Sequence, residues 1–182
     1  MPATKGFTLI ELLIVSTVMI LILTIGLPAM DGFRHKIQAR QDIAGLKMLL
    51  HSSREQAMLM QTRVTLCPLV NNRCSNDWNQ PLSLFTDPNN NRQLDNNETV
   101  LHILAASRRT NTLRNFNNHA VSFDSRGFSG ASAGSFSYCL NDNGQTGLAL
   151  IISRNGRIRK GTDSNHDGLP ETADGKNVQC PS

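Results

Sequence analysis

The 182-residue sequence has few aromatic residues (5%) and few charged residues (18%), and it contains only one long apolar run. That run occupies residues 7–30, and the remainder is polar and rich in Asn, Ser and Gly. A single apolar segment joined to a soluble remainder excludes both a polytopic membrane protein and a wholly disordered chain. No period recurs along the chain, which excludes collagen, coiled-coil and tandem-repeat architectures.

Catalytic motifs are also missing. The sequence contains no Gly-x-x-x-x-Gly-Lys phosphate loop, no His-Glu-x-x-His and no Gly-x-Ser-x-Gly. The five histidines are scattered, and no Cys–His pair has a recognisable spacing. We therefore expect a protein that is not an enzyme. The formal net charge of +4 permits an anionic partner without requiring one.

The four cysteines all lie beyond the apolar run and include no Cys-x-x-Cys pair. Their even number favours disulfides and an oxidising compartment, and the alternatives are four free thiols or a zinc site. Cys67 and Cys74 flank a short loop, so a local bridge is expected. A bridge between Cys139 and Cys180 would hold the polar C-terminal tail in place. The other two pairings of the four cysteines stay open.

The apolar run is long enough to cross a bilayer as a helix, since about 20 residues suffice. We expect a transmembrane segment at about 7–30 within one long helix over residues 7–61, with a kink or unwound turn at Gly26 and Pro28. In its second half, apolar or small residues recur in steps of four and three, which predicts a face packed on the protein's own sheet. These residues are Ala39, Ile43, Leu46, Leu50, Ser53, Ala57 and Met60.

Beyond residue 61, short extended runs alternate with Asn, Asp, Gly and Pro. This pattern predicts an α+β protein in which residues 62–182 form a β-rich domain, with a small antiparallel sheet arrangement over the second half of the helix. The seven expected strands are Arg63–Cys67, Leu82–Thr86, Thr99–Ala105, Ala120–Asp124, Ser135–Leu140, Leu148–Arg154 and Arg157–Arg159.

Glu11 is unusual because a carboxylate near the membrane end of an apolar helix is costly and needs a partner. The surrounding Gly6-Phe7-Thr8-Leu9-Ile10-Glu11-Leu12-Leu13 resembles the type III signal of type IV pilins and type II secretion pseudopilins. The resemblance implies that residues 1–6 are a leader cut after Gly6 by a prepilin peptidase, and that Phe7 is N-methylated. It also implies that Glu11 pairs with the N-terminal amine of a neighbouring subunit, so that two charges that would be unpaired in lipid neutralise one another.

Two acidic segments have the oxygen spacing of a calcium loop. The helices that usually flank such a loop are not expected here, and the alternative for both is a solvated Asx-rich turn. The first segment has Gly168 at the sixth position, and the second has Arg92 there. The oxygen-bearing residues are Asp163, Asn165, Asp167, Glu171 and Asp174 in the first segment, and Asp87, Asn89, Asn91, Asp95 and Glu98 in the second.

A cluster of basic residues lies at 154–160. Asn155-Gly156 after an apolar strand predicts a type I′ hairpin turn, which would place Arg154 opposite Arg157. Arg157 and Arg159 would then share one face about 6.8 Å apart, with the residue between them on the other face. Such a positive tip, which ends with Lys160, would either protect a strand edge or bind the phosphates of a polyanion.

Several segments together resemble the GspH/FimT family over nearly the whole chain. They are the helix, the cysteine-containing strand followed by Trp78, the turn 85–89 with Glu98 and Val100, and the stretch from Tyr138-Cys139 to Arg157. Gly156-Arg157-Ile158-Arg159 matches the Gly-Arg-x-Arg motif of FimT-type minor pilins, which bind DNA for natural transformation.

This resemblance implies a type IV pilin fold and other major and minor pilins as partners. We expect no cofactor, and the oxygen spacing of the first acidic segment leaves calcium there as the alternative. It implies a single-pass inner-membrane precursor with a periplasmic C-terminal domain that later enters a type IV pilus. Double-stranded DNA would contact Arg154, Arg157, Arg159 and Lys160. The alternatives are a structural minor pilin or type II secretion pseudopilin that primes fibre assembly without DNA, and a calcium-stabilised pseudopilin.

Overall fold

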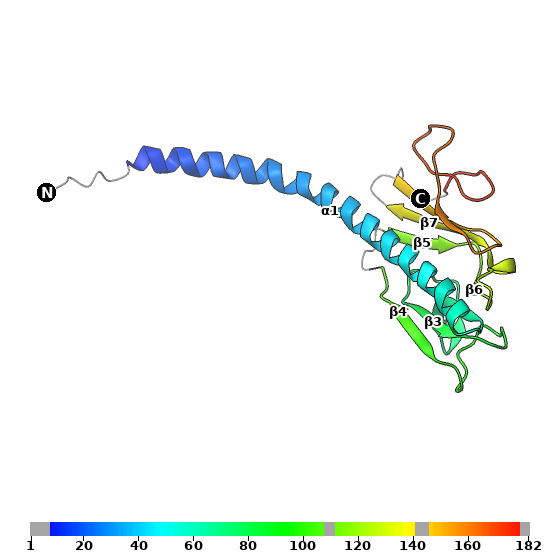
Figure 1. Ribbon diagram of the computed structural model, residues 1–182. Coiled ribbons are helices and arrows are strands. Elements are labelled where there is room, and N and C mark those ends of the chain that lie inside the picture. Colours follow the sequence, from blue (N-terminus) through cyan, green and yellow to red (C-terminus); the bar gives the residue numbers. More distant parts are fainter. Residues whose placement is uncertain (1–7, 108–111, 141–145, 179–182) are drawn as a thin grey trace. The chain divides into compact units, whose positions relative to one another are not determined.

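The computed structural model describes residues 8–107, 112–140 and 146–178 (Figure 1). The chain divides into two compact units, residues 1–38 and residues 39–182. Helix α1 (Leu9–Leu59) runs without interruption past Gly26 and Pro28, so no turn is unwound there. Its bounds lie two residues inside the predicted ones at each end.

The predicted transmembrane segment 7–30 falls in the first unit. In the described part of this segment the apolar side chains are exposed, with Leu9 and Ile10 as examples. No helix among the described residues is both long enough and apolar enough to cross a membrane. Phe7 and the side chains of residues 25–30, which belong to the predicted segment, lie outside the description.

The second half of α1 packs on the sheets of the second unit through the face that its spacing predicts. The buried residues of the predicted stripe are Ile43, Leu46, Leu50, Ser53 and Ala57. Met60, its last residue, is exposed because the helix ends at Leu59. The side chain of Ala39, the first residue of the stripe, lies outside the part of the chain that the structure describes.

The helix ends in a left-handed residue, Gln61, whose φ is 50°. The backbone N–H of Thr62 donates to the carbonyl oxygen of Ala57 at 3.2 Å. Thr62 is the second residue after the C-cap, Met60, and Ala57 is the third residue from the C-terminal end of the helix. This hydrogen bond is therefore that of a Schellman motif, which satisfies a carbonyl group of the last helical turn.

In the described part of the second unit, two antiparallel sheets and a short 3₁₀ helix, η1 (Gly130–Ser132), accompany α1. The first has the order β2-β1-β3-β4, with β6 also paired to β1, and the second has the order β5-β7-β8-β9. The described strands are β1 (Val64–Val70), β2 (Arg73–Cys74), β3 (Leu82–Thr86), β4 (Val100–Leu104), β5 (Thr112–Phe116), β6 (Val121–Phe123), β7 (Gly134–Leu140), β8 (Thr146–Ile152) and β9 (Ile158–Lys160).

One apolar core joins α1 to both sheets, because buried residues of all three belong to the same cluster. An aromatic group of Trp78, Phe116 and Phe136 lies within it, with the Trp78 and Phe136 ring centroids 5.0 Å apart and nearly perpendicular. A polar link adds to this packing, since the Tyr138 hydroxyl donates to the Asp42 carboxylate on α1 at 2.7 Å. The helix therefore fixes the second sheet, whose edge carries the basic cluster.

Two described strands were not predicted. β2 pairs with β1 across a two-residue turn of Asn71 and Asn72, both with positive φ, which is the backbone of a type I′ hairpin. The Cys67–Cys74 disulfide lies on this hairpin and confirms the expected local bridge. The other unpredicted strand, β5, is polar in sequence and includes Arg114, which is buried in the structure.

Candidate nucleic-acid interface

The basic cluster lies on the β8–β9 hairpin, but its turn differs from the predicted one. The register pairs Ile152 with Ile158, and the backbone N–H of Ser153 donates to the carbonyl oxygen of Arg157 at 3.0 Å. The loop between them therefore has three residues, and its Asn155 lacks the positive φ of a type I′ turn. Arg157 thus lies opposite Ser153, and the prediction that it faces Arg154 is wrong.

Contacts with the segment after β6 hold this turn in place. The carbonyl oxygen of Arg154 accepts hydrogen bonds from the backbone N–H groups of Ser129 and Gly130, at 3.1 and 3.0 Å. The Ser129 hydroxyl donates to the carbonyl oxygen of Ser153 at 2.8 Å. These three bonds join two segments that are distant in sequence, so they fix the backbone from which the arginine side chains extend.

Gly156 closes the turn at a point where no side chain fits. Its φ is +76°, which glycine adopts without strain, and a Cβ atom there would lie 1.9 Å from the carbonyl oxygen of Gly127. The same carbonyl oxygen accepts a hydrogen bond from Nε of Arg54 on α1 at 3.0 Å. The glycine of the Gly-Arg-x-Arg stretch is therefore required for packing, because only a residue without a side chain lets the hairpin turn approach the loop at Gly127.

The four predicted basic residues are brought together on the hairpin. Arg154, Arg157, Arg159 and Lys160 are all exposed, whereas Ile158 is buried in the core. This alternation agrees with the predicted placement of Arg157 and Arg159 on one face, with Ile158 on the other. Guanidinium groups on a fixed backbone suit phosphate oxygens, which they contact through charge-assisted hydrogen bonds.

A polar groove adjoins the turn on the outer face of the second sheet. It has a volume of about 610 Å³ and lies between the sheet and the C-terminal segment. Its cations are Arg154 and Lys176, and Asp174 opposes them in charge. A smaller hollow of about 290 Å³ is lined by Arg159 and Glu171 among others. The C-terminal segment therefore brings acidic groups to the same side of the sheet as the hairpin.

In the first acidic segment, carboxylates accept hydrogen bonds from backbone N–H groups of the same segment. Asp163 accepts hydrogen bonds from the N–H groups of Asp167 and Gly168, and Glu171 accepts from those of Ser164 and the residue after it. A hydrogen bond from the Leu169 N–H is the main cause that lowers the pKa of Asp167. Within the part of the chain that the structure describes, no group of three or more His, Cys, Asp or Glu residues is placed to hold a metal ion.

The second acidic segment is built around Asp87, which is fully buried. This carboxylate accepts hydrogen bonds from the Thr65 hydroxyl at 2.7 Å and from the backbone N–H groups of Asn91 and Arg92. Asp95 accepts from the Asn91 side chain and from Asn89 as well. Burial raises the pKa of Glu98, the last residue of the segment. Asp87 thus holds the loop between β3 and β4 against the start of β1.

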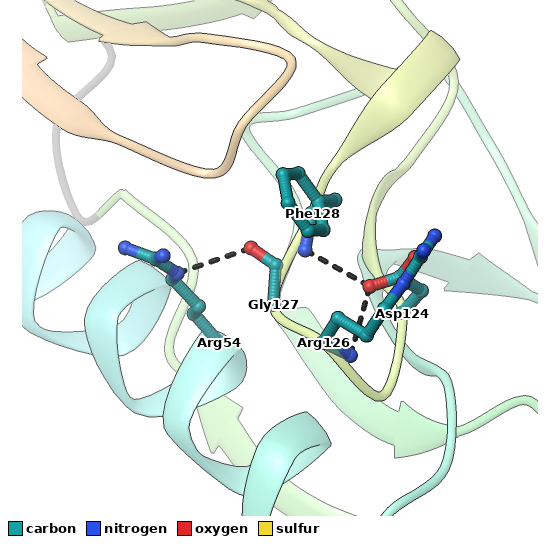
Figure 2. Close-up of polar contacts among 5 residues, drawn as sticks. All are labelled: Arg54, Asp124, Arg126, Gly127 and Phe128. Atoms are coloured by element: carbon teal, nitrogen blue, oxygen red, sulfur yellow. Dashed lines mark hydrogen bonds and ion pairs between the residues drawn. The ribbon is translucent and has the colours of Figure 1, made fainter.

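The loop after β6 carries residues that the sequence analysis did not single out. Asp124 accepts hydrogen bonds from the backbone N–H groups of Arg126 and Phe128, each at 3.0 Å (Figure 2). Its carboxylate also forms an ion pair with the Arg126 guanidinium. Phe128 is 44% exposed. The sequence Asp124-Ser125-Arg126-Gly127 is typical of a tight turn. No local sequence pattern indicates that this turn contacts the basic hairpin.

The remaining predicted residues are placed only in part. Cys139 is disulfide-bonded, and its expected partner Cys180 lies outside the described residues. Gly6 and Phe7, the predicted cleavage and methylation site, also lie outside them. Glu11 lies in the first turn of α1, where the Thr8 N–H is 3.4 Å from its carboxylate.

Comparison with known proteins identifies the fold. The crystal structure of the type IV minor pilin FimU from Pseudomonas aeruginosa (strain PAO1) matches with a TM-score of 0.53 and 19% identity, over 70% of this chain and 90% of that chain. A second crystal form of FimU matches with a TM-score of 0.48 and 17% identity, over 68% and 92% of the two chains. No curated protein matches the sequence. The molecule has the α+β fold of a type IV pilin, as predicted.

A family model confirms the expected relationship. The model described as "Type II transport protein GspH" matches residues 43–156. The chain therefore belongs to the GspH family of minor pilins and pseudopilins. The match covers the last third of α1 and strands β1 to β8, and it ends at Gly156, within the turn of the basic hairpin.

Proposed function

We propose that the chain is a minor pilin that enters a type IV pilus and binds extracellular double-stranded DNA, without sequence preference, for natural transformation. Membership of the family supports the pilin part of this proposal. The DNA-binding part is supported by one observation: three exposed arginines, Arg154, Arg157 and Arg159, extend from a hairpin whose backbone is fixed. Phosphate contacts position a protein on a duplex without reading its sequence.

Fixed geometry matters for the affinity of this contact. An arginine on a mobile loop loses conformational freedom when it binds a phosphate, and that loss opposes binding. Here the bonds from Ser129 and Gly130 to Arg154, and the close approach of Gly156 to Gly127, have already ordered the backbone. The acidic residues of the C-terminal segment act in the opposite direction, so we expect an affinity in the micromolar range or weaker for one subunit.

The proposed life of the chain begins at the inner membrane. The precursor would be anchored by the segment 7–30 with its C-terminal domain in the periplasm, and prepilin peptidase would remove residues 1–6. Glu11 would then pair with the methylated amine of a neighbouring pilin, and the subunit would move into the pilus at the cell surface. Several copies in one fibre would raise the avidity for DNA above the affinity of a single subunit.

The family match favours a second candidate, since its model is named for type II transport. In that case the chain primes assembly of a fibre and the basic hairpin only protects the exposed edge of β9. The two functions differ in one measurable property, which is whether the hairpin cations bind DNA.

Binding of the full chain in detergent micelles to duplex DNA separates the two candidates. We expect the double variant Arg157→Gln, Arg159→Gln to lose at least about tenfold in affinity, equally on duplexes of different sequence. The control is Arg40→Gln, Arg73→Gln, which removes the same charge from two exposed arginines away from the hairpin. Equal losses in the two double variants would contradict a DNA site at the hairpin and favour the structural candidate.

A further inference from the structure

An exposed aromatic ring lies beside the basic hairpin. Phe128 is 44% exposed, and the next two residues, Ser129 and Gly130, donate backbone hydrogen bonds to the carbonyl oxygen of Arg154. The residue before it, Gly127, is in close contact with Gly156. The ring therefore extends from a loop that touches the hairpin turn on both sides of it in sequence.

The loop is ordered before any ligand arrives. The N–H of Phe128 donates to the Asp124 carboxylate at 3.0 Å (Figure 2). The carbonyl oxygen of Phe128 accepts from the Asp124 N–H at 2.9 Å. The N–H of Gly127 also donates to the carbonyl oxygen of Asp124, at 2.8 Å, while Arg54 on α1 holds the Gly127 carbonyl. These hydrogen bonds hold the backbone of the loop in a conformation that leaves Phe128 44% exposed to solvent.

A cation accompanies the ring. The Arg126 guanidinium lies 5.2 Å from the centroid of the Phe128 ring and pairs with Asp124 at 3.0 Å. Asp124 and Arg126 carry opposite charges, so residues 124–130 add no net charge to the surface. What they add is a planar ring with a guanidinium beside it, next to the hairpin cations.

Rings combined with cations are the means by which proteins bind single-stranded nucleic acid, because every base has a face that can stack. We propose that Phe128 stacks against an unpaired base, in single-stranded DNA or at a frayed duplex end, while Arg154 and Arg157 hold the adjoining phosphates. This inference rests on the proposed DNA-binding function, and it extends the substrate class from duplex to unpaired DNA. A paired duplex offers no free base face, so the ring contributes to binding only where bases are unpaired.

The test compares two probes on the full chain in detergent micelles: an oligothymidine strand and a closed hairpin duplex with capped ends. We expect Phe128→Ala to weaken oligothymidine binding by about 5- to 150-fold, the effect of losing one stacked base, with less than about twofold change for the duplex. Phe128→Leu keeps the apolar volume without the aromatic face and should lose as much as Phe128→Ala. Phe128→Tyr should retain the wild-type affinity.

A second readout does not depend on affinity. Phe128→Trp places an indole at the proposed stacking position, and the natural Trp78 is buried and serves as a constant background. We expect oligothymidine, but not the capped duplex, to quench the added fluorescence. Full oligothymidine affinity in Phe128→Leu, or equal losses on both probes, would overturn the proposal. If the Phe128 variants give either of these two results while Arg157→Gln, Arg159→Gln still loses duplex binding, the stacking inference fails and the proposed function stands. A wild-type chain that binds neither probe overturns both.

Discussion

Gly156 at the hairpin turn lies so close to the carbonyl oxygen of Gly127 that a Cβ atom on it would be 1.9 Å from that oxygen. This contact joins the turn between β8 and β9 to the loop after β6, which is in turn hydrogen-bonded to Arg54 on the long helix. The position of the arginines therefore depends on a residue that has no side chain and no charge.

Gly156→Ala tests this dependence. We expect it to lower the free energy of unfolding by more than about 2 kcal/mol, because a Cβ clash with backbone is added to the strain of a positive φ. Urea unfolding followed by the fluorescence of Trp78, which is buried, measures the change. We also expect weaker DNA binding although no cation has been removed.

Gly168→Ala is the matched control. Gly168 has φ +90° in an exposed loop, and no heavy atom beyond its own and those of its two chain neighbours lies within 4 Å of the position of its Cβ. This change should cost only the strain of the left-handed region, about 1 kcal/mol, and leave DNA binding unchanged. Equal losses of stability in the two variants would show that the contact with Gly127 is unimportant.

Asp124 should make the loop after β6 sensitive to acid. Burial raises the pKa of this carboxyl, but hydrogen bonds from the Phe128 N–H and from Arg126 outweigh it, and the net pKa is lowered. A group with a lowered folded pKa stabilises the protein above its unfolded pKa, about 3.9, and this contribution is lost as the pH falls through the folded value. The stability difference between wild type and Asp124→Asn should therefore be constant above about pH 5 and shrink on acidification. A difference that grows as the pH falls would contradict this assignment.

The cysteines should all be oxidised, with Cys139 bonded to Cys180. Alkylation without a reductant should label no cysteine, and peptide mass spectrometry should recover the two predicted bridges. Cys139→Ser should destabilise more than Cys67→Ser, because the first bridge closes a loop of about 40 residues and the second closes one with a separation of 7. In the chain-entropy model the contributions are about 4 and about 2.5 kcal/mol. A larger loss for Cys67→Ser would contradict the expected role of the C-terminal bridge.

The pilin part of the proposal has its own test at the N-terminus. Mass spectrometry of pilus-associated protein should find a chain that begins at methylated Phe7, and a chain that retains Met1 would refute processing after Gly6. Glu11→Val should leave this cleavage intact but prevent incorporation into the pilus, because the amine of the neighbouring subunit loses its partner. Wild-type levels of Glu11→Val in sheared pili would contradict the assembly role.

Sequence patterns predicted the features that are local in origin. The spacing of Ile43, Leu46 and Leu50 gave one helix face, and the alternation around Ile158 gave the face shared by Arg157 and Arg159. Strand β3 was predicted with its exact bounds, since an apolar run between turn residues defines it locally. The disulfide at Cys67 follows from the short loop that it closes.

Features decided by distant contacts could not be predicted. Asn155-Gly156 is a favoured type I′ pair, yet the hydrogen bonds from Ser129 and Gly130 stabilise a three-residue loop instead. The type I′ backbone occurs instead at Asn71 and Asn72, where the distant Leu94 N–H donates to the carbonyl oxygen of Asn72 at 2.8 Å and the two-residue turn is kept. β5 was missed because its buried Arg114 looks like a surface residue in sequence, although the fold provides Asn79 and neighbouring carbonyls as its partners.

The most direct test of the DNA-binding claim is the salt dependence of binding. For the full chain and duplex DNA, the logarithm of the association constant should fall linearly with the logarithm of salt concentration, by about 0.9 for each phosphate contact. Arg157→Gln, Arg159→Gln should reduce this slope by about two, and the control Arg40→Gln, Arg73→Gln should leave it unchanged. A slope that is the same in wild type and in the hairpin double variant, or binding that does not respond to salt, would contradict the claim.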